Sequence, residues 1–260
     1  MSDLSLSRQF SWGAFDALTM AKRNLMIWFK VPAFIVFTIV QPVMFTLLFR
    51  YVFGGAIATG NVNYVDYLLP GIIGQTAAFT SFGTAISLAS EVKTGVLDRL
   101  RAMPIARSAV LLGRLGADVI RLLVTLLIII GVGYLVGFRF LNGVGGAFGL
   151  LALALLMGFA TCCVSAFIGL AIKDEESVQA FGLIWVFPLT FVSSAFVPTQ
   201  TMPGWMQAFA NNQPITQIVD AMRACALGTP YGNHVWAGIL WMLGVIAVFV
   251  PLAVRSYRKA

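Results

Sequence analysis

Residues 140–172 read FLNGVGGAFGLLALALLMGFATCCVSAFIGLAI, a run of 33 positions without one charged side chain. A helix needs about 20 consecutive apolar residues to cross a bilayer. A charge at the centre of such a helix costs roughly 2.5–3.5 kcal/mol on insertion scales. This stretch is therefore long enough and apolar enough to predict a transmembrane helix. The rest of the chain is then expected to fold in a lipid bilayer.

The composition of the whole chain supports the same environment. Of its 260 residues, 59% are hydrophobic and only 10% are charged, whereas soluble domains carry roughly 25% charged residues. We therefore expect an all-α polytopic membrane protein and exclude soluble, disordered and fibrous classes. The net charge of +7 is typical of the excess of basic residues on the cytoplasmic side of membrane proteins, so no nucleic acid is expected as a partner.

The same criterion, applied outward from residues 140–172, predicts six transmembrane helices. The charge-free run 177–219 is ambiguous, since it could hold two spans, or one span and an external segment. Three prolines between Pro198 and Pro214 do not suit a helix that faces lipid, so we expect one span followed by an external elbow. The expected spans are about 31–53, 68–90, 118–138, 147–172, 177–197 and 234–254.

An even number of spans places both ends of the chain on the same side of the membrane. If both ends lie inside, the internal segments hold 14 Lys and Arg residues and the external segments hold three. This asymmetry predicts a protein of the cell membrane with both termini in the cytoplasm. We expect a cytoplasmic N-terminus at 1–30 without a cleaved signal peptide, a transmembrane domain at 31–254 and a cytoplasmic tail at 255–260.

Residues 10–28 predict an amphipathic helix before the first span. Phe10, Ala14, Leu18 and Trp28 belong to an apolar stripe with helical spacing, and basic residues fall on the opposite side. Such a helix lies in the membrane interface with its apolar face toward the lipid. It could be a simple anchor, or it could also contact a cytoplasmic partner.

The loop after the second span begins EVKTGVLDRLRAMP at residues 91–104. This loop contains a short apolar stripe with helical spacing, preceded by a glycine and ended by a proline. The pattern indicates a short helix at the cytoplasmic surface to which another protein could dock. A solvated connecting loop is the alternative. A second helix is expected after Ser108 as its N-cap. On that helix Arg114, Asp118 and Arg121 are spaced i, i+4 and i+7 and therefore share one face.

The external elbow predicts two short re-entrant helices, with a plain outer loop as the alternative. Proline suits the first position of a helix, tryptophan suits the membrane interface, and an Asp and an Arg spaced i, i+3 suit an ion pair. Gly228 is the expected stop of the second helix. The elbow residues singled out are Pro198, Pro203, Trp205, Pro214, Asp220 and Arg223.

Chemical motifs are sparse. The sequence has no phosphate-binding G-x-x-x-x-G-K-[ST] loop, and one histidine, His234, builds neither a usual zinc site nor a catalytic pair. We expect no catalytic, metal or cofactor site, and we assign no role to Cys162, Cys163 or Cys225. The chain is then a transport subunit moved by a separate motor. A six-span intramembrane enzyme and a passive channel or scaffold are the alternatives.

Three stretches resemble a known family. They are EVKTGVLDRLRAMPI at 91–105, FVPTQTMPGW at 196–205 and NNQPITQIVDAMR at 211–223. Together they are similar to the ABC-2 type transporter permeases, especially those of the daunorubicin/doxorubicin-resistance (anthracycline exporter) group. The resemblance implies a permease subunit of an ATP-driven exporter that pairs with a second permease chain as a homodimer or a related heterodimer. ATP and Mg²⁺ would bind to a separate ATP-binding subunit, and the substrate would be a lipophilic drug or antibiotic, a lipid or a glycan.

The resemblance also implies a coupling role for residues 91–104. Polar side chains there would contact the ATP-binding subunit, apolar ones would fill its cleft, and a glycine and a proline would shape the turn. The polar set is Glu91, Asp98, Arg99 and Arg101, the apolar set is Leu97, Leu100 and Met103, and the turn residues are Gly95 and Pro104. No residue is assigned to the substrate.

Overall fold

The computed structural model describes residues 16, 18–26, 30, 32–54, 63–102, 107–230, 232 and 234–259. Within these ranges all regular elements are helices, and no strand occurs. The all-α fold expected from the sequence is thereby confirmed for the described part of the chain. In chain order, after a helical segment at 18–26, the elements are α2 (Pro32–Leu48), η1 (Phe49–Phe53), α3 (Tyr64–Lys93), α4 (Val96–Ala102), α5 (Arg107–Val136), α6 (Gly143–Ile172), α7 (Glu175–Phe191), η2 (Thr199–Thr201), α8 (Gly204–Asn212), α9 (Pro214–Leu227) and α10 (His234–Lys259).

Several of these helices have the length and composition of membrane spans. Within the described residues, four stretches are long and apolar enough to cross a bilayer, namely Tyr64–Lys93, Val110–Val136, Gly143–Ile172 and Val235–Tyr257. A shorter apolar helix covers Thr38–Val52. The protein is therefore a multi-pass membrane protein.

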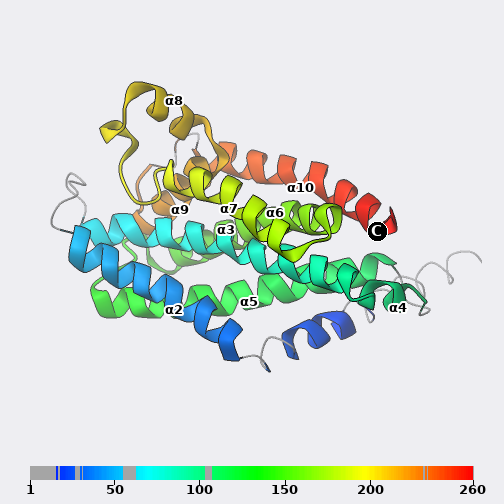
Figure 1. The fold of residues 1–260 in the computed structure, drawn as a ribbon. Coiled ribbons are helices and arrows are strands. Elements are labelled where there is room, and N and C mark those ends of the chain that lie inside the picture. Colours follow the sequence, from blue (N-terminus) through cyan, green and yellow to red (C-terminus); the bar gives the residue numbers. More distant parts are fainter. Residues whose placement is uncertain are drawn as a thin grey trace, which may run out of the picture.

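The long helices lie side by side in a bundle (Figure 1). The small α4 and the C-terminus are at one end of the bundle, and α8 and α9 are at the opposite end. The chain therefore brings the connection between α3 and α5 to the same end as its C-terminus, as the alternation of spans predicts.

Helices α3 and α6 form the centre of the bundle and approach each other closely. A Cβ on Gly169 of α6 would lie 2.4 Å from the carbonyl oxygen of Ala85 in α3. Small residues permit such close packing of helices inside a membrane. Further along the same two helices, the side chains of Ile72 and Met157 are completely buried.

Two helices differ in length from the spans expected at those positions. Helix α5 begins at Arg107, one residue before the expected cap Ser108. It continues without a break into the expected span at 118–138, because charged residues such as Arg114 and Asp118 are buried and can stay within one continuous helix. Helix α7 ends at Phe191, before the expected limit of 197. The backbone from Val192 to Val197 leaves the helix there and is held by side chains of α9.

The ends of several helices follow their capping residues. Helix α9 begins with Pro214 at its first turn, and its cap residue Gly228 has φ of 69°, so both expected signals are confirmed. Pro203 lies one position outside α8 as its cap. Asp174 caps α7, since its carboxylate accepts a hydrogen bond from the Ser177 backbone N–H at 3.0 Å. That backbone bond lowers the pKa of the Asp174 carboxyl below its usual value.

Candidate functional site

The segment expected to couple the chain to a partner forms a turn followed by a short helix. Gly95 adopts φ of 68°, a conformation that favours glycine, and α4 follows directly. Lys93 and Arg99 are exposed at this end of the bundle. Their position fits a surface that another protein could reach.

The apolar residues of α4 face the chain itself. Leu97 and Leu100 are 1% and 6% exposed and belong to a buried cluster with Leu88 of α3 and Leu115 of α5. They therefore connect α4 to the bundle. Asp98 and Arg101 lie in α4, but their side chains are outside the described part, and Met103 and Pro104 lie outside the described residues altogether.

Glu91, also expected at the partner surface, is enclosed by charges of its own chain. One of its carboxylate oxygens lies 3.2 Å from an Arg114 nitrogen and 3.7 Å from an Arg23 nitrogen. Glu91 thus joins the N-terminal helical segment 18–26, the end of α3 and the first half of α5. A movement of α3 relative to the other two elements changes both ion pairs, and a movement of the N-terminal segment or of α5 changes one of them.

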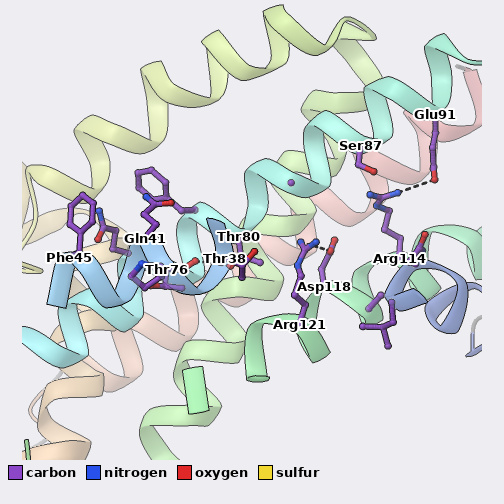
Figure 2. A pocket seen from close by; sticks show the side chains of 17 residues that line it. Thr38, Gln41, Phe45, Thr76, Thr80, Ser87, Glu91, Arg114, Asp118 and Arg121 are labelled. Atoms are coloured by element: carbon purple, nitrogen blue, oxygen red, sulfur yellow. Dashed lines mark hydrogen bonds and ion pairs between the residues drawn. The ribbon is translucent and has the colours of Figure 1, made fainter. Parts of the chain in front are cut away.

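A second ionic group lies deeper between α3 and α5. Asp118 is 4% exposed, and its two carboxylate oxygens accept from Thr84 Oγ1 at 2.6 Å and pair with Arg121 at 2.8 Å. A Cβ on Gly83 would lie 3.3 Å from the Arg121 guanidinium, so the glycine leaves room for it. Figure 2 shows both ion pairs, with Arg114, Asp118 and Arg121 projecting from α5 toward α3. The helical spacing predicted their shared face, but nothing in the sequence indicated that Thr84 would complete the group.

At the opposite end of the bundle, Asp220 and Arg223 form the expected i, i+3 ion pair. The Arg223 guanidinium also donates to the carbonyl oxygens of Tyr67 at 3.2 Å and Ser194 at 2.9 Å, and it lies 3.7 Å from the centre of the Tyr67 ring. Ser194 Oγ donates to Asp220 at 2.7 Å. We call these four residues the outer polar cluster.

The outer polar cluster stabilises the backbone that follows α7. Carbonyl groups released from a helix in an apolar environment need hydrogen-bond donors. Arg223 and the Tyr67 hydroxyl both donate to the Ser194 carbonyl, and Gln213 donates to that of Val192. The i, i+3 spacing of Asp220 and Arg223 predicted them as a pair. Their partners depend on where α7 ends, which the sequence did not reveal.

The other elbow residues are placed around α8. Pro198 precedes the short turn η2, and Trp205 at the start of α8 is 74% exposed. An exposed tryptophan at the end of a membrane bundle is typical of the lipid interface.

Replacing Arg223 by methionine is expected to lower the free energy of unfolding by about 2 kcal/mol. The change removes the donor to two carbonyl groups and leaves Asp220 without its cation. The control is Arg255→Met, because Arg255 is an exposed arginine near the end of α10. Thermal unfolding in detergent measures both variants, and equal midpoints would contradict a stabilising role for the outer polar cluster.

The described residues hold no group of three or more His, Cys, Asp or Glu side chains that could bind a metal ion. The three cysteines are unpaired and buried. His234 begins α10, and its side chain is not among those described. The notable polar groups of the described residues are therefore the ion pairs between and within the helices.

Comparison with known proteins identifies the family to which this helical bundle belongs. The family described as ABC-2 type transporter matches residues 16–227. This chain belongs to that family. The ABC-2 match covers every element from the N-terminal helical segment to the end of α9, including the coupling segment and the outer polar cluster.

Individual ABC-2 relatives extend the similarity to nearly the whole chain. This chain is 34% identical over 242 residues to the daunorubicin resistance ABC transporter permease protein DrrB1 of Streptomyces coeruleorubidus. The alignment covers 93% of this chain and 86% of the relative. It is 30% identical over 250 residues to the probable doxorubicin resistance ABC transporter permease protein DrrC of Mycobacterium tuberculosis, covering 95% and 90%. It is 26% identical over 252 residues to the putative transport permease ycf38 of Pyropia yezoensis, covering 91% and 86%.

Family membership fixes the general activity. The chain is a membrane permease of an ABC transporter. Permeases of this family normally form dimers and work with an ATP-binding subunit, which carries out the hydrolysis of ATP.

Proposed function

We propose that this chain is the permease subunit of an ATP-driven exporter that moves a lipophilic substrate outward across the cell membrane. Its membership of the ABC-2 family carries the proposal. A drug or antibiotic is the substrate class that we favour over a lipid or a glycan, because two relatives are named for daunorubicin and doxorubicin resistance. ATP and Mg²⁺ bind to a separate ATP-binding subunit, and a second permease chain completes the transporter.

In this proposal six helices span the membrane, with both termini in the cytoplasm. The six spans are the four long apolar helices, helix α2 together with η1, and helix α7. The 17 residues of α7 extend for about 26 Å at 1.5 Å per residue, close to the roughly 30 Å thickness of the hydrocarbon core. Helices α8 and α9 re-enter the outer leaflet. The excess of basic residues in the segments at the α4 end supports this orientation.

The N-terminal segment is proposed to lie in the cytoplasmic interface. Within 18–26, Leu18 is 69% exposed, as a side chain directed toward lipid would be, while Met20 is 7% exposed and packs against the bundle. Phe10, Ala14 and Trp28 of the expected stripe lie outside the described residues. The ion pair between Arg23 and Glu91 supports a role beyond anchoring, since it connects this segment to the beginning of the coupling turn.

The coupling segment is proposed to dock on the ATP-binding subunit through its exposed polar residues. Lys93 and Arg99 contact the partner in this scheme, together with those of Asp98, Arg101 and Met103 that face it. Leu97 and Leu100 transmit the movement, because they are packed between α3 and α5. Gly95 and Pro104 set the ends of α4. This arrangement assigns contact to the exposed residues and transmission to the buried ones.

Arg99→Glu is expected to reduce export at least tenfold, because it reverses a charge on the proposed docking surface while leaving the buried face of α4 intact. Accumulation of fluorescent daunorubicin is measured in cells that express the chain with its ATP-binding subunit. Arg139→Glu is the control, since Arg139 is exposed at the opposite end of the bundle. Normal export by Arg99→Glu, with equal amounts of protein in the membrane, would rule out α4 as the docking helix.

A further inference from the structure

The last turns of α10 are buried, although they form the end of the chain. The expected tail at 255–260 continues as part of α10 as far as Lys259, and Tyr257 within it is only 2% exposed. The last residues of a domain are usually poorly ordered unless other parts of the protein hold them. The end of α10 is therefore attached firmly to the rest of the bundle.

Tyr257 belongs to the same buried cluster that holds α4. We call this the inner cluster. Besides Tyr257 and residues of α3, α5 and α6, it contains Ala253 of α10, Leu97 and Leu100 of α4, and Met20 of the N-terminal segment. Closely packed side chains compress little and pass a displacement on to their neighbours. A movement of α4 therefore reaches the last turns of α10 through the inner cluster.

The inner part of α10 is held on both sides of its proline. Pro251 has no backbone N–H to donate and can bend a helix, yet α10 continues beyond it. Before the proline, the ring of Phe249 packs edge-on against that of Phe167 in α6, with 5.9 Å between the centroids. After the proline, Tyr257 is fixed in the inner cluster. These contacts limit bending at Pro251, so α10 can pass a displacement along its length.

At its other end, α10 lies directly against the backbone of α9. A Cβ on Gly238 would lie 3.1 Å from Cα and 3.2 Å from the backbone nitrogen of Ile218. The contact is made by backbone atoms, so no side-chain rotation can absorb a movement of α10 toward α9. At 1.5 Å per residue, about 28 Å of helix separates Gly238 from Tyr257. Helix α10 runs along the bundle between these two contacts (Figure 1).

Helix α9 carries two members of the outer polar cluster. Asp220 and Arg223 follow Ile218 on this helix. The Arg223 guanidinium donates to the Ser194 carbonyl at 2.9 Å and so holds the backbone that follows α7. A displacement of α9 at Ile218 therefore changes the contacts that fix this backbone.

One side of α10 is free to move. Leu240 and Val248 are 67% and 55% exposed, so no described part of the chain covers that side. Helix α3 also runs between the two ends of the bundle, but its backbone lies close to α6 at Gly169. A shift of α3 must therefore move α6 as well, whereas α10 can shift along its exposed side.

We propose that α10 connects the coupling segment mechanically to the outer polar cluster, with Tyr257 as the positioning residue at the inner end and Gly238 as the contact at the outer end. This role of α10 rests on the proposed function, in which α4 docks on the ATP-binding subunit. A displacement of α4 moves the inner cluster, and α10 shifts with it. Helix α9 then changes its hold on the segment after α7. Coupling between distant sites is carried by such packed side chains and rigid helices.

The test measures the rate of ATP hydrolysis by the complex of the full-length chain with its ATP-binding subunit in lipid nanodiscs. We expect Gly238→Ala to lower this rate at least about twofold, the lower limit for variants along a coupling route. The added Cβ displaces α10 from α9, and the displacement reaches α4 through the inner cluster. The matched control is Gly244→Ala on the same helix. No described atom other than the adjoining helix backbone lies within 4 Å of its Cβ, so the rate should not change.

Substitutions of Tyr257 show whether the connection passes through the inner cluster. Tyr257→Ala removes the ring, so Gly238→Ala should have no further effect on hydrolysis in that variant, a non-additivity expected of coupled residues. Tyr257→Leu is used instead if the alanine variant does not fold. Tyr257→Phe keeps the ring and should preserve the effect of Gly238→Ala. Phe138→Ala should preserve it too, because this change truncates a completely buried ring outside the inner cluster.

The results distinguish a failure of this connection from a failure of the proposed function. If Gly238→Ala leaves hydrolysis unchanged, or lowers it equally with and without the Tyr257 ring, α10 does not connect the two ends, while the export function stands. If the effect of Gly238→Ala disappears only when the Tyr257 ring is removed, the connection is supported. If the unmodified chain does not alter ATP hydrolysis by the subunit at all, docking through α4 fails, and the role of α10 fails with it.

Discussion

Replacing Asp118 by leucine is expected to lower the free energy of unfolding by about 3–5 kcal/mol, the range for the loss of one partner from a buried ion pair. Asp118 lies between α3 and α5 and is 4% exposed. Its removal leaves the Arg121 guanidinium, whose side chain is 18% exposed, without its counterion, and the Thr84 hydroxyl loses its acceptor. Unfolding by SDS, followed by circular dichroism in mixed micelles, measures the change.

The double variant Asp118→Leu/Arg121→Leu is the informative control. When both partners of a buried pair are replaced by apolar residues, the effect on stability is often neutral. We therefore expect the second substitution to recover most of the stability that the first removes. If the double variant is as unstable as Asp118→Leu, the loss arises from packing between α3 and α5 and not from an uncompensated charge.

The regular parts of the fold were accessible from the sequence because each depends on local physics. The run at 140–172 contains no charge, so a helix that crosses the membrane is the favoured structure for it. Pro214 and Gly228 begin and end α9 through backbone preferences that act within one or two residues. Signals of this kind do not depend on what packs against the helix.

The continuity of α5 and the end of α7 could not be predicted because they depend on residues far away in the sequence. The charged first half of α5 was predicted as a separate helix after Ser108, and its fusion with the span that follows depends on Glu91 and Thr84 of α3, which face it. The segment after α7 leaves the helix where α9 supplies Gln213 and Arg223 as donors to its carbonyls. A count of apolar residues cannot include such partners.

The coupling segment shows the same limit for function. An apolar stripe on a short helix indicates one buried face, but it does not say whether the neighbour is the same chain or another protein. In the structure Leu97 and Leu100 are buried against their own bundle. The exposed side of α4 therefore becomes the part that remains for a partner.

Replacing Gly71 by alanine is expected to lower the free energy of unfolding by about 3 kcal/mol, at the upper end of the usual range for overpacking. A Cβ at this position of α3 would lie 1.8 Å from the carbonyl oxygen of Ala195 and 2.6 Å from its carbonyl carbon. These are backbone atoms, so no side-chain rotation relieves the contact. The segment that carries Ala195 is itself fixed by Arg223 and Tyr67 through the adjacent Ser194 carbonyl.

Gly131→Ala makes the identical chemical change on α5, where no described atom other than the adjoining backbone of the same helix lies within 4 Å of the added Cβ. Alanine favours a helix over glycine by up to about 1 kcal/mol, so this control should be as stable as the unmodified chain or slightly more so. Thermal unfolding of both variants in the same detergent gives the comparison. If Gly71→Ala unfolds at the same temperature as Gly131→Ala, then α3 and the segment after α7 are not in the close contact described here, and the outer polar cluster holds that backbone in some other position.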